Sequence, residues 1–200
     1  MKLTDMLSSE HRVIEQVVAA LDAAAARLDA GERMRPGFFE DATRFIAEFS
    51  DGCHHAKEEQ VLFPALGRQG LPTDTGPVAV MLHEHDEGRR LTAGLREAAA
   101  RMAAHQAGAA DVTADYARAY ASLLAQHIFK EDNILFPLAL RVIPAADWEA
   151  IAEEAERVDR AQAAGGHAPY LALARKLCED AGVDPDSLPP RVGGLPCHAR

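Results

Sequence analysis

Apolar residues recur three or four positions apart along most of the chain, the spacing that places side chains on one face of an α-helix. Between residues 6 and 28 the pattern is carried by Val13, Ile14, Val17, Val18, Leu21 and Leu28. Similar patterns predict helices over residues 36–66, 77–105 and 111–140, separated by short segments rich in Gly, Pro and Asp. Four long helices with short connections predict an all-α, up-down-up-down four-helix bundle over residues 1–143.

The rest of the chain carries shorter helical patterns. They cover residues 147–163 and 168–181, and several prolines follow Asp184. We therefore expect residues 144–200 to form a C-terminal helical extension that packs on the bundle and ends in an irregular tail.

Composition and charge narrow the class of protein. A 200-residue chain with 48% hydrophobic residues is long enough for one domain with a real core. A formal charge of −10 argues against a nucleic-acid partner. No stretch approaches the roughly 20 apolar residues that span a bilayer, and no secretory signal is visible. The three cysteines form no disulfide framework. We expect a cytoplasmic protein; protein partners and oligomeric state are left open.

One phrase occurs twice. HHAKEEQVLFP fills residues 54–64 and HIFKEDNILFP fills residues 127–137, with six of the eleven positions identical. The dipeptide Glu-His also occurs twice, with His11 43 residues before His54 and His85 42 residues before His127. The chain is therefore an internal duplication of one helix pair, which predicts pseudo-two-fold symmetry in the bundle.

The repeated residues have the chemistry of metal ligands. His54 with Glu58, and His127 with Glu131, stand four residues apart and so share a helix face. If the histidines of the two Glu-His dipeptides also face inward, four imidazoles and two carboxylates converge. Buried carboxylates without partners are very costly, and a pair of divalent cations removes that cost. Imidazole and carboxylate together suit iron, manganese or zinc. A lone His-x-x-x-Glu is usually a solvated pair, but two matched copies favour a metal site.

The motifs EHRVIE, HHAKEEQVLFP, EHDEGRRL and HIFKEDNILFP resemble those of hemerythrin-like proteins of the HHE cation-binding family, over about residues 5–140. The resemblance implies a four-helix bundle around two non-haem iron ions, often with a bridging oxygen species; zinc or manganese is less favoured. Carried over residue by residue, the ligands are His11, His54, Glu58, His85, His127 and Glu131. The two glutamates would be the bridges.

The sequence departs from the oxygen carriers of this family. They use a fifth histidine one turn before the ligand of the third helix, where this chain has Met81. His55 could supply the missing imidazole or could lie at the rim of the site. His83 is a weaker candidate, because residues two apart on a helix point in different directions. The carriers also place their last carboxylate five residues after its histidine, where Asp132 stands, but Glu131 fits the internal repeat.

Further residues are candidates for supporting roles. Tyr116 and Tyr120 precede His127 by eleven and seven residues and fall near its helix face. They are expected to be core residues, with proton or electron transfer as the alternative. Glu15, four residues after His11, could orient that ligand as a hydrogen-bond acceptor. Lys57 and Lys130 are expected to be solvated.

Three functions fit such a site. The first is binding or sensing of O2, NO or peroxide at a carboxylate-bridged metal pair. The alternative is an enzyme of oxidative or nitrosative stress defence that reduces peroxide or NO, or repairs iron–sulfur clusters. A structural zinc site is the third and least favoured function, because structural zinc usually has a closed tetrahedral shell with thiolates. The sequence does not decide whether the protein is an enzyme.

Overall fold

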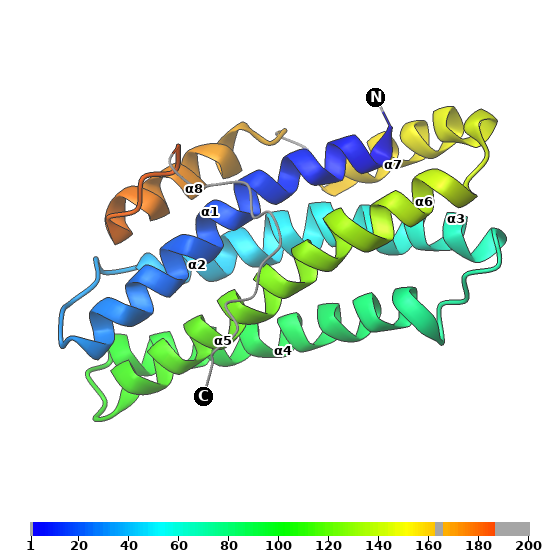
Figure 1. The fold of residues 1–200 in the computed structure, drawn as a ribbon. Helices are drawn as coiled ribbons and strands as arrows, with labels where there is room; N and C mark the ends of the chain where they lie inside the picture. Colours follow the sequence, from blue (N-terminus) through cyan, green and yellow to red (C-terminus); the bar gives the residue numbers. More distant parts are fainter. Residues whose placement is uncertain (1, 163–165, 187–200) are drawn as a thin grey trace.

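The fold is known from a computed structural model, which describes residues 2–162 and 166–186. These residues are helical and include no strand, as predicted. Four long helical stretches lie side by side and alternate in direction, which gives the expected four-helix bundle (Figure 1). No helix in the described ranges is both long and apolar enough to cross a membrane.

The bundle begins with α1 (Leu3–Asp29). The second stretch consists of α2, η1, η2 and α3, which cover Phe38–Phe45, Ile46–His55, Glu58–Leu62 and Phe63–Arg68. The third is α4 (Gly76–Ala103). The fourth consists of α5, η3 and α6, which cover Ala109–Lys130, Glu131–Leu135 and Phe136–Val142.

Three segments of the second and fourth stretches are π-helical, which the sequence analysis did not predict. They are η1, η2 and η3, and they include His54, His55, Glu58 and Glu131. Gly52 fits this geometry, because a Cβ atom there would lie 3.0 Å from the Ala47 carbonyl oxygen. Such wide turns occur frequently at functional sites.

The prolines of the repeated phrase do not end their helices. Pro64 and Pro137 stand in the first turn of α3 and α6, directly after a π-helical segment. A proline is tolerated there because its missing N–H group is not needed by the first turn of an α-helix. The helical stretches continue to Arg68 and Val142.

Two hydrophobic clusters enclose the middle of the bundle. On α1, Leu3 and Leu7 belong to one cluster, whereas Ile14 and the apolar residues after it belong to the other. His11 lies between them and is fully buried. The polar residues predicted from the sequence therefore occupy a layer between two apolar cores.

The described part of the extension consists of η4 (Ala145–Asp147), α7 (Trp148–Gln162) and α8 (Ala168–Ala181). Apolar residues of α7 pack into the cluster that contains Leu3. The α8 helix packs beside α1, and its Asp180 pairs at 2.6 Å with Arg35, which lies between α1 and α2. The expected end of the tail, with Cys197 and His198, lies outside the described residues.

Candidate metal centre

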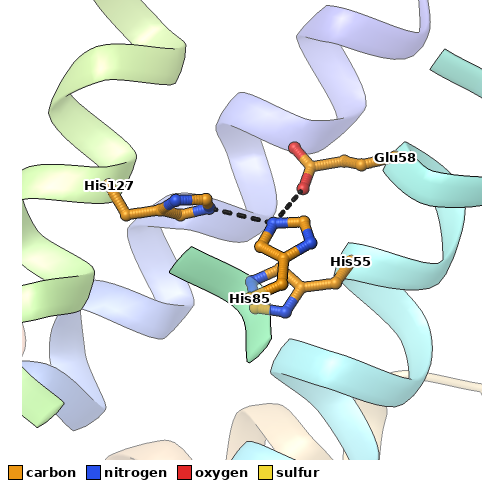
Figure 2. A group of neighbouring side chains, drawn as sticks. All are labelled: His55, Glu58, His85 and His127. Atoms are coloured by element: carbon orange, nitrogen blue, oxygen red, sulfur yellow. Dashed lines mark hydrogen bonds and ion pairs between the residues drawn. The ribbon is translucent and has the colours of Figure 1, made fainter. Parts of the chain in front are cut away.

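Seven buried side chains meet between the two cores. They form two adjoining groups whose potential ligand atoms lie within 4.8 Å of one another. The first group is His11, His54, Glu58 and Glu131, and the second is His55, Glu58, His85 and His127. Figure 2 shows the second group, with His55 and His85 stacked below Glu58. Glu58 belongs to both groups.

The imidazoles face one another through their Nε2 atoms. These atoms are 3.0 Å apart in the His11–His54 pair and 3.2 Å apart in the His85–His127 pair. Two ligands at right angles on one metal, each about 2.1 Å from it, would be about 3 Å apart. The observed spacing therefore suits two imidazoles that share a cation.

The carboxylates between the imidazoles lack hydrogen bonds. Their oxygens approach histidine Nε2 atoms at 3.2–3.6 Å. Even so, both oxygens of Glu58, both oxygens of Glu131 and Nε2 of His55 have no hydrogen-bond partner in the described part of the chain. Orphaned buried polar atoms of this kind are rare and costly. This set of donors fits metal ions bound between the two carboxylates.

Each of the five imidazoles also has a carboxylate at its Nδ1 atom. The pairs are His11–Asp132 at 2.9 Å, His54–Glu10 at 2.9 Å, His55–Asp51 at 3.3 Å, His85–Glu59 at 2.7 Å and His127–Glu84 at 3.0 Å. An Nδ1–H that donates to a carboxylate fixes the ring and leaves Nε2 free to bind a metal.

These acceptors were not predicted from the sequence. Glu15 was the candidate acceptor for His11, but it pairs with Arg12 at 2.8 Å, and the acceptor for His11 is Asp132. The repeat itself could have identified four of these acceptors. The glutamate before each first-helix histidine, and the acid after each HxxxE glutamate, occur at matching positions in both halves.

Burial and neighbouring charges set opposite protonation preferences in the metal-free protein. Burial opposes a charged His11, but the hydrogen bond to Asp132 and the nearby negative charge of Glu131 outweigh it and raise the pKa of His11 to about 10. In the same way, Glu58 and Glu59 raise the pKa of His85 to about 9 against the effect of burial. Burial and the nearby His85 lower the pKa of His55 well below 6.5.

The phenylalanines of the repeated phrase support the first-helix histidines. Phe136 stacks on His11 with ring centroids 5.5 Å apart, and Phe63 stacks on His85 at 5.8 Å. Both phenylalanines are buried. Each copy of the phrase therefore supplies a histidine, a carboxylate and the apolar ring that packs against a histidine from the other half.

The weaker candidates fall in different places. His55 lies inside the second group, whereas His83 is exposed and belongs to neither. Tyr120 is buried, and burial raises the pKa of its hydroxyl. Tyr116 is half-buried and packs against Gly94, where a Cβ atom would lie 2.3 Å from the tyrosine ring.

A cavity of about 190 Å³ adjoins the second group only. His55, His85 and His127 line it together with apolar side chains that include Ile46, Tyr120 and Leu124. Gly88 and the ion-paired Asp51 and Arg89 also line it. The cavity gives a small molecule a route to this side of the site.

Lys57 corrects one expectation. It was expected to be solvated, but it is 0% exposed and pairs with Glu10 and with Asp159 of α7. Burial opposes its charge, but these carboxylates raise the pKa of Lys57. Lys130, its counterpart in the repeat, pairs with Glu84 and is 31% exposed.

Comparisons with known proteins agree with this site. The sequence profile of the Hemerythrin HHE cation binding domain matches residues 2–139. An uncharacterized protein of Mycobacterium tuberculosis is 27% identical over 173 residues, which cover 86% of this chain and 66% of that protein. Because 86% exceeds the share of residues 1–143, that match includes part of the extension.

Two other relatives carry functional names. The iron-sulfur cluster repair protein YtfE of Musicola paradisiaca is 36% identical over 99 residues, covering 44% of this chain and 40% of that protein. The iron-sulfur cluster repair protein DnrN of Neisseria gonorrhoeae is 38% identical over 90 residues, which cover 44% of this chain and 57% of that protein. The chain thus spans less than two thirds of each of these three relatives. No solved structure gave a significant match.

The family profile covers well over half of the chain and includes both groups of candidate ligands. The chain therefore belongs to the Hemerythrin HHE cation binding domain family.

Proposed function

We propose that the protein holds two iron ions, one in each group, and binds or senses a small ligand such as O2, NO or peroxide beside them. The observation that carries this proposal is the set of buried Glu58 and Glu131 oxygens that lack hydrogen bonds between five imidazoles. Glu58 belongs to both groups and would help to hold both ions, and Glu131, whose carboxylate lies 3.2 Å from His11 and 3.3 Å from His127, could do the same. Imidazole and carboxylate ligands suit iron.

Different residues of the chain would have different roles around such a metal pair. The pair itself would supply redox and Lewis-acid chemistry. The carboxylates at each Nδ1 hold the histidines in position. The cavity beside His55, His85 and His127 has room for a ligand of a few atoms. Tyr120 lines this cavity, and its buried hydroxyl has no hydrogen-bond partner in the described part of the chain, so it is free to donate a hydrogen bond.

A second candidate function is an enzyme of oxidative or nitrosative stress defence. It is supported by the similarity to proteins named for the repair of iron–sulfur clusters. In this reading the site would reduce peroxide or NO, or would donate iron to a damaged cluster. The matches cover 44% of this chain and 40% and 57% of those two proteins, so the activity of the whole relatives comes to this chain only as a proposal.

To separate these functions, the ferrous protein is prepared without air and is then mixed with O2, NO or peroxide, one at a time. A ligand spectrum that reverses when the gas is removed supports binding or sensing. Catalytic consumption of peroxide or NO, or transfer of iron to a cluster-free acceptor protein, supports the enzyme. If the iron-loaded protein gives no spectral change and no turnover with any of them, both functions are wrong.

A further inference from the structure

A chain of ion pairs leads from the candidate metal centre into the C-terminal extension. Glu10 accepts a hydrogen bond from Nδ1 of His54 at 2.9 Å and also pairs with the Lys57 ammonium. Lys57 lies 2.8 Å from Asp159 of α7, and Asp159 lies 2.9 Å from Nε2 of His167. The last two residues are partly exposed. One continuous set of contacts therefore joins a candidate ligand to the extension.

Lys57 needs both of its carboxylates. A buried ammonium without enough compensating charge is very costly, and removing one partner of a buried ion pair is strongly destabilising. Glu10 comes from the bundle and Asp159 from the extension, and Lys57 has no exposed surface through which water could replace either of them. Without Asp159, the position of Lys57, and with it that of Glu10, is no longer fixed.

The cluster around Asp159 does not require a metal of its own. Cys53, Asp159 and His167 lie close enough together to hold one. However, the Lys57 ammonium already sits 2.8 Å from Asp159, and a metal cation there would face that positive charge. The cation of this cluster is the lysine.

The other half of the repeat lacks this arrangement. Lys130 pairs with Glu84, which accepts a hydrogen bond from His127. Among the described residues no second carboxylate pairs with Lys130, and water reaches it because it is 31% exposed. The two metal positions are therefore supported differently, although the two phrases are nearly the same.

We propose that Asp159 is a positioning residue of the metal centre: through Lys57 and Glu10 it fixes His54, so that the extension controls how firmly the ion of the His11–His54 group is held. Among the described residues no ion pair links His85 or His127 to the extension, so the extension acts mainly on the first ion. This inference rests on the proposed pair of iron ions. It assigns the extension a role in the retention or release of one ion of the two.

The test is the release of iron from the intact, iron-loaded protein to a ferrous chelator. In the Asp159→Asn variant we expect half of the iron to leave about 10- to 100-fold faster, the range seen when partners of metal ligands are removed. The other half should leave at the wild-type rate. The matched control is Asp180→Asn, which breaks another ion pair between the extension and the bundle, with Arg35, away from Lys57. It should leave both rates unchanged.

Three outcomes overturn the inference. They are wild-type release from Asp159→Asn, faster release of all the iron in one phase, and the same change in Asp180→Asn. If Asp159→Asn does not fold, Asp159→Glu is measured in its place, because it keeps a negative charge beside Lys57 but moves the carboxylate, and Lys57 and Glu10 stay paired. It should still release half of the iron faster, and uniform release contradicts the inference. The wild-type iron content is measured first: a chain without two irons shows that the proposed function fails, and the inference with it.

Discussion

Glu84 accepts a hydrogen bond from Nδ1 of His127 at 3.0 Å, while the next residue, His85, directs its own Nε2 atom to the Nε2 atom of that same histidine. Glu10 and His11 stand in the same relation to His54. Each Glu-His dipeptide therefore supplies one candidate ligand and orients another on a different helix.

Replacing Glu84 with alanine should weaken iron binding without removing a ligand. The His127 imidazole would lose the acceptor that fixes its orientation, and loss of such a partner typically costs about 10- to 100-fold in metal affinity. Competition with a chelator of known affinity measures this. His83→Ala is the matched control, because His83 is exposed and lies one residue before Glu84. Equal affinities of both variants and the wild type would show that Glu84 does not orient His127.

His55 should supply the fifth imidazole. Its Nε2 atom is buried without a hydrogen bond and lies in the group with His85 and His127. His55→Ala should lower the affinity for one iron by about 10- to 100-fold or more, at least as much as the loss of an outer partner. Titration with ferrous iron would then show one strong and one weak binding step. If His55→Ala keeps two strong binding steps, or if His83→Ala loses one, His55 is not the fifth imidazole ligand.

Gly88 should control access to the site. A Cβ atom at this position would lie 3.9 Å from Tyr120 and from Leu123, so alanine fits without strain. A leucine side chain would fill part of the adjoining cavity of about 190 Å³. Gly88→Leu should therefore slow the binding of azide or NO to the iron-loaded protein by about tenfold or more, equivalent to about 1.4 kcal/mol of barrier. Stopped-flow absorbance measures the rate.

Two results on Gly88 would count against this route. One is an unchanged binding rate in Gly88→Leu with full iron content. The other is an equal slowing in Gly88→Ala, because the added methyl group makes only ordinary contacts. Either would place the access route on another side of the bundle.

The stability of the metal-free protein should fall as pH rises. The folded-state pKa is about 10 for His11 and about 9 for His85, above the ordinary value of 6.5. Raised pKa values stabilise the fold fully below the unfolded pKa, and that stabilisation is lost as pH rises through the folded values. Urea unfolding should give a free energy on the order of a few kcal/mol lower near pH 10 than near pH 6.5.

Bound iron should remove this pH dependence, because a metal-bound imidazole carries no proton at its ligating nitrogen. The double variant His11→Gln, His85→Gln provides the control in the metal-free state. It should lose most of the decline in stability between these pH values. A decline as steep as in the wild type would mean that other groups cause it.

Much of the candidate site could be predicted from the sequence because its histidines and glutamates stand at short, repeated spacings along the chain. The four-residue spacing of His54 and Glu58, and its copy at His127 and Glu131, places each pair on one face of any regular helix. The matched Glu-His dipeptides then identify the two partner helices. The apolar periodicity gave the bundle, because helices of this length must bury one face.

The rest depends on contacts that local spacing does not encode. The π-helical segment Ile46–His55 carries two adjacent histidines that belong to different groups, and the 3.6-residue period of the α-helix gives no sign of such a segment. The burial of Lys57 depends on Asp159, which lies 102 residues away in the chain. Neither could be derived from helical periodicity alone.

The central claim is that two histidine-rich groups hold two iron ions in one buried layer. The most direct test is the metal content of the purified protein and of the double variant His54→Ala, His127→Ala, measured by elemental analysis. We expect about two irons per chain in the wild type and almost none in the variant, which loses one imidazole from each group. Zinc in place of iron in the wild type, or full iron content in the variant, would contradict it.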